Sequence, residues 1–115
     1  MLCKVYEITG KFATDTDSGQ DLYDMIFPHL AKGESVQLDF TNVAVFAVSF
    51  FNYAIGQLLQ HITTDDLNRL LTFKEISPTG INVLNRSIDN AKKYYTDPQY
   101  QRAVDTVIEE YAASF

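Results

Sequence analysis

The sequence has little cysteine, no clustered glycine and no long apolar run. Cys3 is the only cysteine among 115 residues, so no disulfide forms within the chain, which fits a reducing compartment. The five glycines stand apart from one another, which excludes the glycine-rich loops that cradle phosphates. The longest mainly apolar run, residues 43–51, is too short to span a bilayer. The first residues, MLCKVYEI, lack the apolar stretch of a secretory signal, so we expect a cytoplasmic protein.

Basic residues are also scarce. Nine Lys and Arg residues face fifteen Asp and Glu residues, which gives a formal net charge of -6. Neutralising the phosphates of a nucleic acid requires clustered Lys and Arg, and Lys92 and Lys93 are the only adjacent pair. We therefore expect no binding to nucleic acid or to an anionic membrane, and we interpret the charge as a solvated acidic surface.

No pattern of metal-ligating or catalytic residues is present. His29 and His61 lie 32 residues apart, and neither has a partner at metal-ligand spacing. The Asp15-Asp17-Gly19 stretch lacks the glycine position and the closing carboxylate of an EF-hand calcium loop. We expect a turn there, and we predict no metal site, no cofactor and no enzyme activity.

Strands are predicted from period-two alternation. Val36, Leu38 and Phe40 alternate with Gln37 and Asp39, which indicates a strand with one apolar face. Residues 3–8 and 71–76 are predicted as two further strands, and the irregular region 6–14 has room for a fourth. Because Gln37 and Asp39 make one strand face polar, we expect the helices to lie mainly on the other face.

Helices are predicted between these strands and after them. The first is predicted to start at Ser18, with Asp21 in a weak capping box, to bend or break at Pro28 and to close at Lys32-Gly33. A helix from Ser49 to residue 62 and a short one capped by Thr63 or Thr64 come next. Ser77-Pro78 is predicted to start a helix with Ile81, Leu84, Ile88, Ala91 and Tyr95 on its buried face.

The alternation of strands and helices predicts an α/β layer architecture. At 115 residues and 46% hydrophobic composition, one domain spanning residues 1–115 is expected. Its core is predicted over about 1–95, with a small sheet of three to five strands. A further C-terminal helix is predicted over about 98–113, and its apolar stripe consists of Tyr100, Val104, Val107, Ile108 and Tyr111.

The strand with the letters LDF leads into a helix that starts with the letters SF. This LDF…SF core resembles the STAS domain of bacterial anti-sigma-factor antagonists, and more closely the STAS-like family. The resemblance extends from Phe12 to about Tyr95. The pieces that carry it are Gly19-Gln20-Asp21-Leu22, Val36 to Phe40, Val43, Ser49-Phe50, Gly56 and Leu71-Thr72-Phe73-Lys74.

This resemblance implies a fold and a function. It implies a small STAS-like sheet and a non-enzymatic, bacterial regulatory module that binds a protein partner. That partner would be a GHKL-type ATP-binding kinase, of the kind that the antagonists engage. The sequence itself does not indicate an oligomeric state.

Ser49 is the candidate phosphoacceptor. The resemblance implies this role, because the antagonists are phosphorylated at a Ser that starts the helix after the second core strand. The chain has Ala47-Val48-Ser49-Phe50 where they carry Asp-Ser-Ser-Gly, so the Asp is missing. The alternative is that Ser49 is a plain N-cap, since Ser is a preferred capping residue.

Two surfaces are candidates for binding. Large apolar groups are dense between residues 43 and 53, more than one helix face and one strand junction bury easily, and exposed apolar patches mark interfaces. The alternative is a small-molecule binding protein or enzyme with a pocket at the carboxyl ends of the strands, near Asp39 and Asn42. The partner-binding candidates are Val43, Phe46, Phe50, Asn52 and Tyr53.

Overall fold

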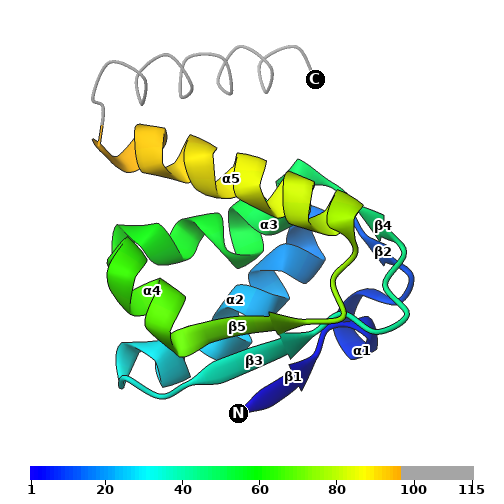
Figure 1. Cartoon of the computed structure of the whole chain (residues 1–115), viewed down its shortest axis with the longest axis horizontal. Coiled ribbons are helices and arrows are strands. Elements are labelled where there is room, and N and C mark those ends of the chain that lie inside the picture. The colour runs from blue at the N-terminus through cyan, green and yellow to red at the C-terminus, as the bar shows by residue number, and fades with distance from the viewer. Residues whose placement is uncertain (97–115) are drawn as a thin grey trace.

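The computed structural model describes residues 1–96 and shows helices stacked on one face of a parallel sheet (Figure 1). Three strands form the sheet in the order β1-β3-β5, and β2 and β4 form a second, two-stranded sheet. The predicted α/β class is thereby confirmed. The elements are β1 (Leu2–Lys4), α1 (Tyr6–Thr9), β2 (Phe12–Ala13), α2 (Thr16–Ala31), β3 (Val36–Asp39), β4 (Val45–Phe46), α3 (Val48–Ala54), the 3₁₀ helix η1 (Gly56–Gln60), α4 (Thr64–Leu70), β5 (Leu71–Lys74) and α5 (Pro78–Thr96).

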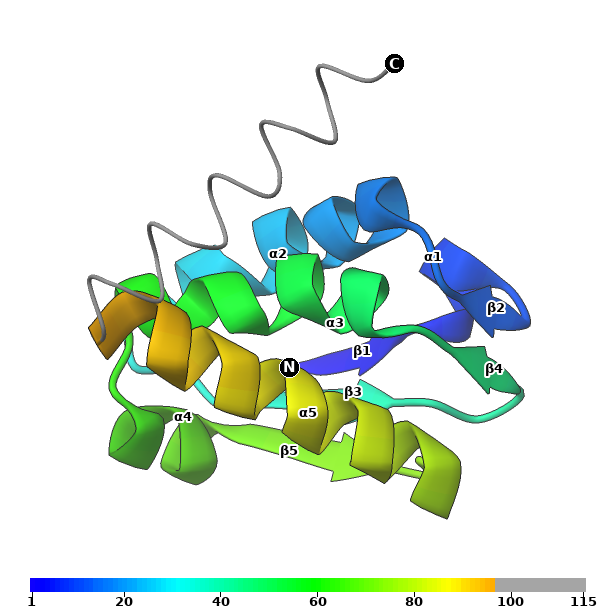
Figure 2. The same cartoon turned by 90° about the horizontal axis from the view of Figure 1, so that it is seen from above.

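The two faces of the main sheet differ in polarity. Cys3, Leu38 and Phe73 are register partners across the three strands, and this row faces the helices, with Leu38 completely buried. The neighbouring row of Leu2, Gln37 and Thr72 is exposed on the other face. Seen from above, α2, α3 and α5 lie beside one another on the sheet (Figure 2). The prediction that helices cover mainly one face is confirmed.

The fourth strand lies within the predicted region 6–14, but in the separate β2–β4 sheet. Phe12 pairs with Val45 and Ala13 with Phe46. The predicted strand over residues 3–8 is too long, because the chain leaves β1 after Lys4 and forms α1. Val5 is completely buried. Its carbonyl accepts hydrogen bonds from the amides of Ile8 and Thr9, and these bonds form the helical turn.

Helix α2 differs from its prediction at its start and in its interior. It begins at Thr16, because the Asp15 carboxylate caps it by accepting a hydrogen bond from the Ser18 amide at 2.9 Å. Pro28 does not interrupt it, since the helix continues to Ala31. The predicted C-terminal end is confirmed: Gly33 has φ +80, and its amide and that of Glu34 bond to the carbonyls of Leu30 and His29 in a Schellman motif.

The helix predicted over residues 49–62 is two elements, α3 and η1. The predicted cap at Thr63 is confirmed, because its hydroxyl accepts a hydrogen bond from the Asp66 amide. The predicted helix start at Ser77-Pro78 is also confirmed: α5 begins at Pro78, and the Ser77 hydroxyl accepts a hydrogen bond from the Gly80 amide. The buried face of α5 differs from the predicted one, since Ile81 is exposed and Ser87 is buried. The predicted helix over 98–113 lies outside the described residues.

Candidate functional site

The region from Val43 to Tyr53 connects β3, β4 and α3 at the carboxyl end of the sheet. Asn52 and Tyr53 are exposed, and Phe46 is half-buried. Phe50 is completely buried and Val43 is nearly so. The prediction that these two contact a partner is therefore corrected, because their side chains belong to the core.

The helical period of α3 explains this division. Phe50, Phe51 and Ala54 face the core, so the exposed side lies at positions 49, 52 and 53. The Phe50 and Phe51 rings contact each other with centroids 5.3 Å apart. Most of the large apolar side chains of this segment therefore pack in the core. The part of α3 that is exposed is limited to the side with positions 49, 52 and 53.

Ser49 is exposed in the first turn of α3, but it is not the N-cap. Ala47 occupies the N-cap position, without a side-chain hydrogen bond. The Ser49 hydroxyl donates to the carbonyl of Thr14 at 2.9 Å, which lies in the connection between β2 and α2. The alternative of a plain N-cap is therefore wrong, and the hydroxyl joins α3 to a segment 35 residues earlier.

Two exposed apolar residues were not among the predicted site residues. Phe12 is 55% exposed and Val45 is 42% exposed, and they are register partners on β2 and β4. Strands of two residues carry no periodicity, so the sequence offers no signal that pairs these two side chains.

These residues form one corner of the molecule, where β2, β4 and the start of α3 lie together (Figure 2). The Ala47 amide bonds to the Ala13 carbonyl at 3.0 Å, which places the start of α3 next to β2. Tyr53 lies one helical turn beyond Ser49 on the same side of α3. We call this the corner surface, and its residues are Phe12, Val45, Ser49 and Tyr53.

Negative charge borders the corner surface. Asp15 follows Thr14 directly, and Asp17 and Asp21 are exposed in the first turns of α2. The hydrogen bonds from Ser18 hold the pKa of the Asp15 carboxyl below its usual range, so Asp15 is ionised at neutral pH. A group that adds negative charge at Ser49 would enter a region that is already acidic.

Asp39 and Asn42, the residues of the alternative ligand pocket, serve a turn at the end of β3. The Asp39 carboxylate accepts hydrogen bonds from the Thr41 amide at 2.9 Å and the Thr41 hydroxyl at 2.6 Å. These bonds, with smaller contributions from Lys74 and Lys4, lower the pKa of Asp39. Asn42 adopts φ 72, a conformation that Asn tolerates.

Within residues 1–96, no three His, Cys, Asp or Glu side chains gather where they would hold a metal ion. No helix in this part of the chain is both long and apolar enough to cross a membrane.

Comparison with known proteins and protein families identifies one matching family. No curated protein and no solved structure matches the chain. Residues 18–80 match a family described as a STAS-like domain of unknown function (DUF4325). The match covers more than half of the chain and includes the LDF strand β3 and the Ser49-Phe50 start of α3, which confirms the resemblance seen in the sequence. The chain therefore belongs to this family of STAS-like domains.

Proposed function

We propose that this protein is a cytoplasmic, bacterial regulatory module without enzyme activity, and that it binds a protein partner through the corner surface. The observation that carries this proposal is the pair of exposed apolar side chains, Phe12 and Val45, beside the exposed Ser49 and Tyr53. Aromatic side chains are enriched in protein interfaces, and a polar rim commonly surrounds an apolar centre. The acidic residues of α2 supply such a rim.

The partner we propose is a GHKL-type ATP-binding kinase, as for an anti-sigma-factor antagonist. Two features support this choice: membership of a STAS-like family, and the place of Ser49 at the start of the helix after the second strand of the main sheet. Under this proposal Ser49 is the phosphoacceptor, and phosphorylation weakens the complex. A phosphate adds about -1.5 to -2 charges beside the acidic start of α2.

Val45→Asp is expected to abolish partner capture without loss of fold. Val45 is already 42% exposed, so a carboxylate costs the free protein little, whereas a buried unpaired charge in the complex costs several kcal/mol, about 2–5. The measurement is affinity capture from the native host, read by mass spectrometry, followed by calorimetry with the purified partner.

The matched control is Leu2→Asp, which changes an apolar residue of similar exposure, 53%, on the open face of the sheet. Recovery of a GHKL-type ATPase with the wild type and Leu2→Asp, but not with Val45→Asp, supports the proposal. Equal recovery with the wild type and both variants would contradict the proposed surface. Recovery of a tightly bound metabolite in place of a protein would favour the small-molecule alternative.

Ser49→Asp is expected to weaken the partner complex, whereas Ser49→Ala leaves it nearly unchanged. Both substitutions remove the hydrogen bond to Thr14, so each costs the free protein about 0.5–1.5 kcal/mol. Only Asp adds a charge, and we expect this charge to weaken binding of the partner by about 1–2 kcal/mol through repulsion and desolvation. Calorimetry on the two variants isolates the effect of charge from the loss of the hydrogen bond.

Equal affinity of Ser49→Asp and Ser49→Ala, together with no phosphate on the native protein by mass spectrometry, would end the phosphorylation proposal. That result would not contradict the proposed binding surface, because the Val45→Asp variant tests the surface separately. Urea melts of both variants show whether the bond to Thr14 has the expected modest effect on the free energy of unfolding.

A further inference from the structure

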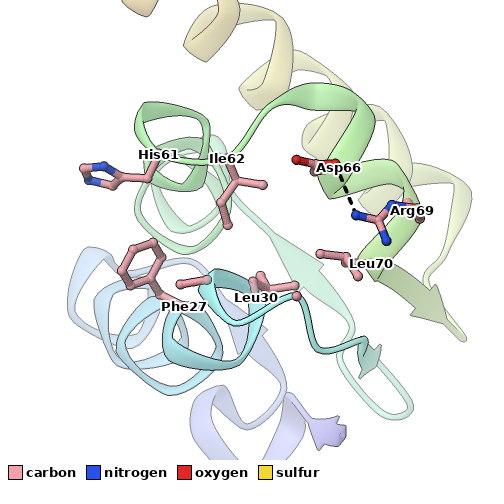
Figure 3. A pocket seen from close by; sticks show the side chains of 9 residues that line it. Phe27, Leu30, His61, Ile62, Asp66, Arg69 and Leu70 are labelled. Atoms are coloured by element: carbon pink, nitrogen blue, oxygen red, sulfur yellow. Dashed lines mark hydrogen bonds and ion pairs between the residues drawn. The ribbon is translucent and has the colours of Figure 1, made fainter.

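A hollow of about 240 Å³ lies between the end of α2, the turn after η1 and α4 (Figure 3). The side chains at its floor, Leu30, Ile62 and Leu70, are already nearly fully buried. At its edge Asp66 pairs with Arg69 at 3.2 Å. The hollow therefore exposes little apolar surface that a partner could cover. Outside the corner surface, exposed apolar side chains gather instead beside β1.

Strand β1 is an outer strand of the main sheet. The sheet has the order β1-β3-β5, so within residues 1–96 only β3 pairs with β1, and Figure 1 shows β1 along the lower border of the molecule. The Val5 amide donates to the Asp39 carbonyl. Because alternate residues of a parallel strand bond to the same neighbour, Cys3 also bonds to β3, and the backbone N–H and C=O groups of Leu2 and Lys4 point away from the sheet. The backbone of such an edge is a template for pairing with another chain.

Apolar side chains flank this edge on both faces of the sheet. Leu2 is 53% exposed on the open face, and Met25 of α2 is 44% exposed on the face that the helices cover. Met25 lies directly over β1, because its Sδ is 3.6 Å from the Cys3 Sγ. Met1, which precedes β1, is also exposed. A strand that adds to this edge would therefore bury apolar area and form backbone hydrogen bonds at the same time.

The charge on the edge strand is balanced. Lys4 is the only charged side chain of β1, and its register partner on β3 is Asp39. Besides the hydrogen bonds from Thr41, the ammonium groups of Lys74 and Lys4 help to lower the pKa of the Asp39 carboxyl, so the Lys4 and Asp39 charges attract each other. A second copy of this chain can therefore approach the edge without meeting an unpaired charge on the strand.

We propose that β1 pairs with β1 of a second copy, antiparallel and about a two-fold axis beside Cys3. The two main sheets then form one continuous sheet. In this register Leu2 lies opposite Lys4 of the second copy, and the two residues exchange a pair of backbone hydrogen bonds. The symmetry repeats this pair on the other side of the axis, so the outward-pointing N–H and C=O groups of both strands are all bonded.

The side chains of β1 favour a second copy over a strand of another sequence. Because residue 2 faces residue 4 across the axis, no charge lies directly opposite a like charge. The aliphatic stem of Lys4 covers Leu2 of the second copy, while its ammonium group stays in water beside Asp39. On the other face the two Cys3 side chains lie across the axis from each other, and the flexible Met25 side chains beside them can fill the space.

This proposal goes beyond the proposed function and does not depend on it. The corner surface lies on α3 and on the two-stranded sheet of β2 and β4, whereas the proposed dimer forms through the main sheet. Either proposal can therefore fail while the other holds.

Sedimentation equilibrium of the full chain under reducing conditions is the first test. Lys4→Pro removes an outward-pointing N–H, which an edge strand tolerates, while Lys4→Ala removes the same side chain and keeps the N–H. Because the symmetry counts each lost hydrogen bond twice, we expect Lys4→Pro to raise the dimer dissociation constant about tenfold or more relative to Lys4→Ala. A wild type that stays monomeric at every concentration, or equal constants for the two folded variants, overturns the proposal. Circular dichroism checks the fold.

A charge swap at position 2 tests the register. Leu2→Lys places a like charge opposite Lys4 of the second copy, whereas Leu2→Asp places an opposite charge there. Since two such pairs form in each dimer, we expect the dissociation constant of Leu2→Lys to be about tenfold above that of Leu2→Asp. Adding Lys4→Glu to Leu2→Lys should reverse the weakening. Equal constants for Leu2→Lys and Leu2→Asp overturn the proposed pairing.

Hydrogen exchange measured by NMR locates the interface without any substitution. The Lys4 amide should exchange severalfold more slowly at a concentration where the dimer forms than at one where the monomer dominates. The control is Phe73 on the outer strand β5. The Phe40 amide bonds to the Lys74 carbonyl, so alternation points the Phe73 amide away from the sheet, and its exchange rate should not change. Unchanged exchange at Lys4 overturns the proposal, and slowing at Phe73 in its place would move the interface to β5.

Discussion

Gly19→Ala is expected to destabilise the protein by about 1–2 kcal/mol, although alanine is the better helix former. A Cβ at position 19 would lie 2.5 Å from the Phe50 carbonyl oxygen and 3.0 Å from the Cβ of Tyr53. The oxygen belongs to the backbone of α3, so no side-chain rotation relieves the clash, and α2 and α3 must separate. Overpacking of this kind costs about 1–3 kcal/mol or more, which exceeds the gain of about 1 kcal/mol in helix propensity. Reversible urea unfolding measures the loss.

Gly56→Ala is the matched control for this prediction. Gly56 is also a buried glycine, yet a Cβ there would meet Ala91 at 3.5 Å and the Ser87 hydroxyl at 3.7 Å, which are ordinary contact distances. Its free energy of unfolding should change by less than about 1 kcal/mol. A Gly19→Ala variant as stable as Gly56→Ala would contradict the close crossing of α2 and α3.

Local signals predicted much of the fold. Strand β3 was predicted because its alternation is strong, and its apolar residues are all buried. The cap at Thr63 and the helix start at Ser77-Pro78 were predicted, because a helix start depends on hydrogen bonds to amides only a few residues away. The end of α2 at Lys32-Gly33 is local in the same sense, since glycine tolerates the positive φ that the Schellman motif needs.

Tertiary contacts decided the features that the sequence did not predict. The hydroxyl of Ser49 has its partner 35 residues away, so the local pattern suggested a cap where none exists. Ser87 replaces an apolar residue on the buried face of α5, because its hydroxyl donates to the Asn52 side chain at 2.7 Å. That bond satisfies a buried polar group, and it explains why counting apolar residues placed Ile81 on the wrong side.

The candidate site was predicted as a segment, but not as a surface. The apolar density between residues 43 and 53 indicated the correct connection, yet it could not separate Phe50 in the core from Tyr53 on the surface. Phe12 comes next to Val45 only through the β2–β4 pairing. Pairing between strands of two residues depends on the surrounding fold, and it leaves no trace in a single sequence.

Leu38→Ala is expected to cause the largest loss of stability, about 2–5 kcal/mol. Leu38 lies in the central strand of the main sheet, between Cys3 and Phe73 in the register, and it is completely buried. Removing its branched side chain leaves a cavity that the strands on both sides cannot close, because both are fixed by backbone hydrogen bonds to β3. The free energy of unfolding is measured by reversible denaturant melts, with circular dichroism to confirm the fold.

The neighbour of Leu38 provides the control, because the strand period places the next side chain on the open face. Gln37 is exposed there, so Gln37→Ala should change the free energy of unfolding by less than about 0.5 kcal/mol. A large difference between the two variants tests the register, since a shift by one residue would exchange the faces and reverse the order of the two effects. A loss below about 1 kcal/mol for Leu38→Ala, smaller than cavities of this kind produce, would contradict the central position of β3 in the core.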